Sequence, residues 1–180
     1  PASRNAIFCA HLEMLEDEPG LECFLVPVGG GGLISGCATA ARGVRPTAKI
    51  YGVQSAVFPS MSQSLKDQPI ACGTQSLAEG ISVREPGKRT LAIVRKLVED
   101  VLIVSEIDIE EAILMYLEIE KSVVEGAGAV GLAALLESPE LFRGRKVGLV
   151  VSGGNIDMPV LSDIILRGLA RSERMVRLNI

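Results

Sequence analysis

Two glycine loops, each directly after an apolar run typical of a strand, constrain the fold of this chain more than any other feature. The first loop, Gly29–Gly32, follows the apolar residues 24–28, and the second, residues 152–155 (Ser-Gly-Gly-Asn), follows the apolar residues 147–151. In an open parallel sheet, ligands bind at the carboxyl ends of the strands. The two loops are therefore expected to contact one ligand together.

The rest of the chain alternates between strand-like and helix-like stretches. Strands are expected over 23–28, 49–55, 101–104 and 146–151, and helices over 5–17, 33–43, 58–65, 88–99, 105–121, 128–136 and 158–170. Residues 66–86 contain several glycines and prolines and are expected to form an irregular loop that is functional or contacts a neighbour. The alternation predicts an α/β fold, a three-layer αβα open parallel sheet with helices on both faces.

Composition excludes several classes of protein. The 180 residues are 48% hydrophobic with a mean hydropathy of +0.35, which suits one globular domain. The net charge of -4 and the absence of basic clusters with aromatic residues argue against nucleic-acid binding. No apolar run is long enough to span a membrane and no secretory signal is present, so a cytoplasmic protein is expected, with an organellar location not excluded. Four cysteines without a CxxC pair, and one histidine, indicate neither a zinc site nor a disulfide framework.

The tetraglycine suits a phosphate group, because glycines let successive backbone N–H groups turn inward and the following helix adds its positive end. Leu33 would be the first helical donor. The sequence lacks the Gly-Lys-Ser/Thr of a Walker loop, and a tight strand-to-helix turn is the alternative. Ser152 could donate to a pyridine nitrogen without protonating it, or it could cap a turn. A phosphate and a pyridine ring together indicate pyridoxal 5′-phosphate.

Four motifs in the same order and at similar spacing resemble the threonine/serine dehydratases (threonine ammonia-lyases) among the fold type II pyridoxal phosphate enzymes. They are residues 29–36, 77–81, 125–129 and 152–155, and the resemblance runs from about Phe24 to Ala170. It implies the large-domain portion of an enzyme that converts L-threonine or L-serine to a 2-oxo acid (2-oxobutanoate or pyruvate) and ammonia, in isoleucine biosynthesis or threonine catabolism. The implied partners are a small hydroxyamino acid and further copies of the same protein in a homo-oligomer.

The resemblance also implies roles for individual residues. Glu125 would lie near the cofactor ring and is the one candidate for a catalytic residue, the alternative being a carboxylate favoured by a helix N-terminus. Ser152 would contact the pyridine nitrogen. The phosphate would be held by Gly29, Gly30, Gly31, Gly32 and Leu33.

The sequence also departs from the family. None of its lysines has the Ser-Phe-like context of the lysine that forms the Schiff base, and the Ser-x-Gly-Asn-His loop is missing. The chain begins at Pro1 and is interpreted as the C-terminal part of a catalytic domain, inactive alone. Residues 1–171 would be the cofactor-binding portion, and residues 172–180 would begin a linker or an ACT-like domain. Residues 54–60 lack the carboxylates that bind a divalent cation in serine racemases, so no metal is expected.

Two further interpretations remain open at this stage. The parent could be another fold type II enzyme, either a serine racemase or a β-replacing synthase. It could also be a non-catalytic module that binds a phosphate or a nucleotide.

Overall fold

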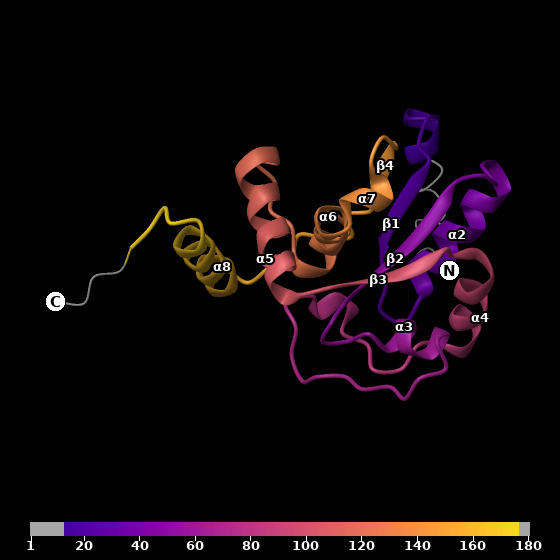
Figure 1. The fold of residues 1–180 in the computed structure, drawn as a ribbon, viewed down its shortest axis with the longest axis horizontal. Coiled ribbons are helices and arrows are strands. Elements are labelled where there is room, and N and C mark those ends of the chain that lie inside the picture. The colour runs from indigo at the N-terminus through magenta and orange to yellow at the C-terminus, as the bar shows by residue number, and fades with distance from the viewer. Residues whose placement is uncertain (1–12, 177–180) are drawn as a thin grey trace.

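The computed structural model describes residues 13–176 and contains a four-stranded sheet (Figure 1). The strands are β1 (Cys23–Pro27), β2 (Lys49–Ser55), β3 (Asp100–Val104) and β4 (Val147–Leu149). Their order across the sheet is β3-β2-β1-β4, and every pair is parallel. Because all the strands are parallel, each connection must return across a face of the sheet. The predicted parallel sheet is confirmed.

Helices cover both faces of the sheet because alternate side chains of each strand point to opposite sides. Phe24 and Val26 of β1 join a core with α2 (Gly32–Val44) and α4 (Lys88–Leu97). Leu25, between them, joins a second core with α5 (Glu106–Met115) and α6 (Gly126–Glu137). The chain therefore has the predicted three-layer αβα arrangement.

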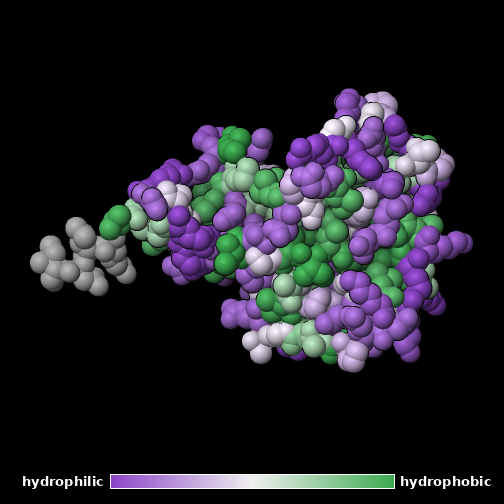
Figure 2. All heavy atoms as spheres, in the orientation of Figure 1, coloured by the Kyte–Doolittle hydropathy of each residue, from purple (hydrophilic) through white to green (hydrophobic). Residues whose placement is uncertain are grey.

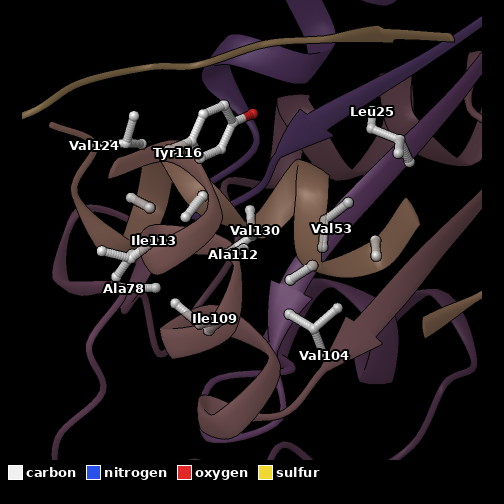
Figure 3. Packing of buried hydrophobic residues seen from close by; sticks show 14 of the residues in the cluster. Leu25, Val53, Ala78, Val104, Ile109, Ala112, Ile113, Tyr116, Val124 and Val130 are labelled. Carbon is white, nitrogen blue, oxygen red and sulfur yellow. The ribbon is translucent and has the colours of Figure 1, made fainter. Parts of the chain in front are cut away.

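The second core packs α6 onto β1, β2 and β3, and α5 packs against α6 (Figure 3). Ile109 and Ile113 of α5 and Val130 of α6 are at most 1% exposed. Alanines and glycines on α6 allow it to lie close to its neighbours. Each fully buried side chain of this size contributes about 1.5–3 kcal/mol. This packing fixes the N-terminus of α6 beside the carboxyl ends of β1 and β2.

The remaining elements are shorter or peripheral. They are α3 (Ser60–Leu65), a 3-10 turn η1 (Glu79–Ile81), a π-helical turn η2 (Tyr116–Glu120), α7 (Pro139–Phe142) and α8 (Met158–Arg171). Helix α8 lies against α5 on the side away from the sheet (Figure 1). Arg167 and Arg171 of α8 form ion pairs of 2.7 and 2.6 Å with Glu110 of α5.

Several boundaries differ from those predicted. The capping box at the start of α5 is confirmed, since Ser105 and Asp108 cap each other. Helix α6 begins at residue 126 rather than 128, because small residues continue its first turn close to residues 77 and 78. Strand β4 is shorter than 146–151, although the N–H of Val150 still bonds to Leu25. The sequence did not indicate α7 or η1, and the last turn of the helix expected over 105–121 is the π-helical η2.

Two predictions fall wholly or partly on residues that the structure does not describe. The helix expected over 5–17 is helical from residue 13 to residue 17, and Cys9 and His11 lie outside the described residues. The alternation of apolar and polar residues over 175–180 also predicts a strand. Residues 175 and 176 have no regular structure, and 177–180 lie outside the described residues.

The surface carries some apolar side chains. Hydrophobic residues gather near the middle of the face in Figure 2, with hydrophilic residues around them. Ile103, Leu136 and Val151 are among the large apolar residues that remain more than a third exposed. None of the helices within residues 13–176 has the length and hydropathy that crossing a bilayer requires.

Candidate functional site

A cavity of about 320 Å³ lies at the carboxyl ends of β1 and β4, where the two glycine loops meet. The tetraglycine loop with Leu33 forms one wall and Ser152 contributes to another. Gly80 and Ile81 of η1 and Glu125 at the start of α6 complete the lining. All the residues that the sequence singled out for the cofactor therefore face one space, although up to 123 positions separate them in the chain.

Gly31 is the position in the loop that requires glycine. Its φ of +89° lies in the left-handed region, where a side chain is strained, and it is the N-cap of α2. A Cβ at this position would lie 2.6 Å from the terminal methyl of Met61 and 2.9 Å from Thr90. Steric bulk and backbone conformation thus both disfavour larger residues there.

The loop presents a series of free hydrogen-bond donors. Within residues 13–176, no acceptor pairs with any backbone N–H from Gly29 to Leu33. The carbonyl groups of Val28, Gly30 and Gly31, in contrast, all accept hydrogen bonds. Unpaired N–H groups beside a cavity, at the positive end of a 13-residue helix, favour an anion. Glycine at these positions leaves the cradle open.

Ser152 and Glu125 lie opposite this loop. Ser152 is exposed, and its hydroxyl makes no hydrogen bond to the described residues, so the alternative that it caps a turn has no support. Glu125 is half-buried and is the N-cap of α6, but its side chain caps no backbone N–H. Its carboxylate lies so close to Gly153 that a Cβ there would collide with it. The backbone N–H of Glu125 donates to the Gly153 carbonyl at 3.2 Å.

A larger cavity of about 700 Å³ adjoins the first and shares Gly80, Glu125 and Ala127 with it. Its charged lining is mainly acidic: one guanidinium, from Arg167, faces the carboxylates of Glu79, Glu106, Glu110, Glu125 and Asp157. An anion is therefore favoured in the smaller cavity and disfavoured in the larger one. Glu79 is exposed and lines the larger cavity only.

Sequence reasoning missed Glu106, which lines the larger cavity, and the groups that bond to it. Glu106 accepts hydrogen bonds of 2.6 Å from Ser55, 2.7 Å from Ser76 and 2.6 Å from the N–H of Leu77. These bonds hold the start of the segment that lines the cavity at Gly80. The only sequence signal was the place of Glu106 within the capping box, which indicates a helix start and not a long-range contact.

Two groups are absent from the described site. No lysine lines either cavity in the part of the chain that the structure describes. No three side chains of His, Cys, Asp or Glu come close enough to hold a metal ion within residues 13–176. The absence of a metal from the complete protein stays a prediction.

Comparison with known proteins gives a family and close relatives. Residues 9–153 match the family model described as pyridoxal-phosphate dependent enzyme. The L-threonine ammonia-lyase of Thermotoga maritima is 46% identical over 167 residues, which are 92% of this chain and 41% of that protein. The chain thus spans less than half of that relative.

Solved structures similar to the chain support the same family. A threonine deaminase of T.th. has a TM-score of 0.78 and 34% identity, over 84% of this chain and 58% of that one. Maize serine racemase has a TM-score of 0.80, also with 34% identity, over 92% of this chain and 53% of that one. The resemblance to threonine dehydratases, the fold type II architecture and the pyridoxal phosphate cofactor are confirmed.

Proposed function

The chain belongs to the pyridoxal-phosphate dependent enzyme family, and on that premise we propose that it is the cofactor-binding part of an L-threonine ammonia-lyase. The complete enzyme would convert L-threonine, or L-serine, to a 2-oxo acid and ammonia. Two relatives that carry this name, 46% and 44% identical to the chain, support threonine as the substrate. Homo-oligomerisation of the complete protein stays a prediction.

One observation carries the assignment of the cofactor site. Residues Gly29–Leu33, whose five N–H groups have no acceptor within residues 13–176, line a cavity together with Ser152 and Glu125. A phosphate dianion needs several converging donors, and these are available without any rearrangement of the described backbone. We assign the phosphate to this loop and the cofactor ring to the space between the loop and Ser152.

Pyridoxal phosphate, when bound, supplies an electron-withdrawing ring system that stabilises negative charge at the α-carbon of an amino acid. The residues of this chain would orient that ring and tune its protonation. A hydroxyl group at Ser152 can donate a hydrogen bond to the ring nitrogen without leaving a proton on it. A carboxylate in the same place would favour a protonated ring and a deeper electron sink. A serine in contact with the ring nitrogen would therefore favour prompt loss of the β-hydroxyl group.

Glu125 would act near the same ring. It is half-buried, its carboxylate has no hydrogen-bond partner among the described residues, and it borders both cavities. From this position it can accept a hydrogen bond from a ring substituent and hold the ring in one orientation. The lysine that moves the α-proton in this family is not among the residues that line the described cavities.

The first test uses the complete protein. It should bind pyridoxal phosphate and convert L-threonine to 2-oxobutanoate, measured by a coupled dehydrogenase assay. Gly31→Asp should abolish cofactor retention, because the new carboxylate repels phosphate and its Cβ collides with Met61 and Thr90. Gly43→Asp is the matched control, since a Cβ at that exposed glycine of the same helix meets nothing within 4 Å. Unchanged cofactor occupancy in Gly31→Asp would contradict the phosphate assignment.

A serine racemase is the second candidate, because the maize enzyme is as similar in sequence as the threonine deaminase. The product distinguishes the two activities: D-serine from L-serine indicates racemisation, and 2-oxobutanoate from L-threonine indicates elimination. A protein that binds nucleotide but produces neither compound would instead support a non-catalytic module.

A further inference from the structure

The carbonyl groups of the tetraglycine loop are held from behind, on the side of α4. The carbonyl of Gly30 accepts a hydrogen bond of 2.5 Å from the hydroxyl of Thr90 and one of 3.2 Å from the N–H of Gly87. Thr90 also lies 2.8 Å from the carbonyl of Gly87. A hydroxyl has a single proton, and the shorter contact is the one to Gly30.

The same arrangement occurs earlier in the loop. The carbonyl of Val28 accepts a hydrogen bond of 3.1 Å from the side-chain amide of Gln54. Gln54 is fully buried, and its other end accepts a bond of 3.0 Å from the N–H of Ser62. Both polar ends of this side chain are therefore in use, and neither faces the cavity.

Because the peptide group is planar, the direction of each of these carbonyl groups also sets the direction of the N–H group of the next residue. In a planar trans peptide, the C=O and N–H groups point in opposite directions. A Gly30 carbonyl fixed toward α4 directs the N–H of Gly31 away from α4, and a fixed Val28 carbonyl likewise sets the direction of the N–H of Gly29. Both N–H groups lack a partner in the described part of the chain, and both residues line the smaller cavity.

We propose that Thr90 is a positioning residue for the phosphate cradle: it holds the Gly30 carbonyl so that the Gly31 N–H faces the cofactor phosphate. The inference rests on the proposed function, because it needs a phosphate in the smaller cavity. Thr90 does not line that cavity itself and acts only through the loop. Without the hydroxyl, only the longer bond of 3.2 Å from the N–H of Gly87 holds the Gly30 carbonyl. The peptide between Gly30 and Gly31 is then held less firmly, and the glycines on both sides restrict its rotation little.

The test compares two ligands that differ only in the phosphate. Dissociation constants of pyridoxal phosphate and of pyridoxal are measured by fluorescence titration of the complete protein without cofactor. Thr90→Val has the same shape but lacks the donor, and it should weaken pyridoxal phosphate binding about tenfold, as expected for a lost charge-assisted hydrogen bond. Pyridoxal binding should not change. Thr90→Ser, which keeps the hydroxyl, should restore the affinity of the wild type.

Thr39→Val is the matched control. The hydroxyl of Thr39 bonds to the Ser35 carbonyl within α2 at 2.7 Å and does not contact the loop, so both affinities should be retained. Equal weakening of both ligands by Thr90→Val, or no effect on either, would overturn the positioning role. If the wild type binds pyridoxal as tightly as pyridoxal phosphate, the phosphate assignment itself is wrong, and the inference is overturned with it.

Discussion

Glu106 accepts a hydrogen bond of 2.6 Å from the backbone N–H of Leu77, which lies 29 positions earlier in the chain. The same carboxylate also accepts bonds from Ser55 at the end of β2 and from Ser76. Charged acceptors form the stronger hydrogen bonds, and three donors converge here. Glu106 thus anchors the irregular segment just before its residues enter the cofactor cavity.

Removing the carboxylate of Glu106 should loosen residues 77–82. Glu106→Ala leaves the N–H of Leu77 and two hydroxyl groups without their acceptor, and we expect a loss of about 1–3 kcal/mol in the free energy of unfolding. Amide hydrogen exchange at residues 77–82 should increase. Glu111→Ala, at an exposed position of the same helix, is the control and should change neither quantity. Unchanged exchange in Glu106→Ala would show that other contacts hold the segment.

Gly126 allows residues 77 and 78 to pass close to α6. A Cβ on Gly126 would collide with the backbone carbonyl of Leu77, which cannot move as a side chain can. We expect Gly126→Ala to destabilise the fold by about 1–3 kcal/mol in urea unfolding. Gly131→Ala in the same helix has only ordinary contacts at 3.7 Å and should stabilise it by up to about 1 kcal/mol. The reverse ranking would contradict this close approach.

Ser152 should matter for turnover more than for cofactor binding. Because the phosphate supplies most of the polar contacts in the proposed site, Ser152→Ala should keep the cofactor bound. The rate of elimination from L-threonine should fall by roughly 10- to 100-fold, which corresponds to a loss of about 1.4–2.7 kcal/mol of transition-state stabilisation. Cofactor absorbance and kcat measured on one sample distinguish the two effects. An unaltered kcat would remove Ser152 from the mechanism.

We expect Cys37 and Cys72 to differ in thiol reactivity. Burial raises the pKa of the Cys37 thiol from 9.0 to about 12, so at pH 8 this group stays protonated and unreactive. Cys72 is only partly buried. We expect iodoacetamide at pH 8 to alkylate Cys72 within minutes and Cys37 only after unfolding, as determined by peptide mass mapping. Rapid labelling of Cys37 in the folded protein would mean that α2 packs more loosely than described.

The ion pairs between α5 and α8 should respond asymmetrically to mutation. The side chain of Glu110 is 9% exposed, whereas Arg167 and Arg171 are 48% and 33% exposed. Removing both arginines leaves the buried carboxylate of Glu110 without an ion-pair partner. The free energy of unfolding in urea should then fall by about 3 kcal/mol. Glu110→Ala leaves two arginines that water can reach, so it should lower the free energy of unfolding clearly less. Equal costs would indicate that Glu110 is hydrated in solution.

Much of the fold could be read from local patterns. The apolar runs before the glycine loops, the helical spacing between them and the capping box at Ser105 and Asp108 each depend on neighbours within a few residues. These patterns predicted four strands and most of the helices in the correct order. Element ends such as the start of α6 and the end of β4 were predicted less well, because long-range packing decides them.

The sequence by itself determined which residue types could hold a phosphate: four consecutive glycines leave backbone donors free, and only glycine readily accepts the left-handed conformation at Gly31. The direction in which those donors point depends on contacts between distant parts of the chain. The side chains of Thr90 and Gln54 hold the loop carbonyls from α4 and β2, over 60 and 26 positions of sequence. No local pattern contains such contacts, because they exist only once the crossovers have brought those elements behind the loop.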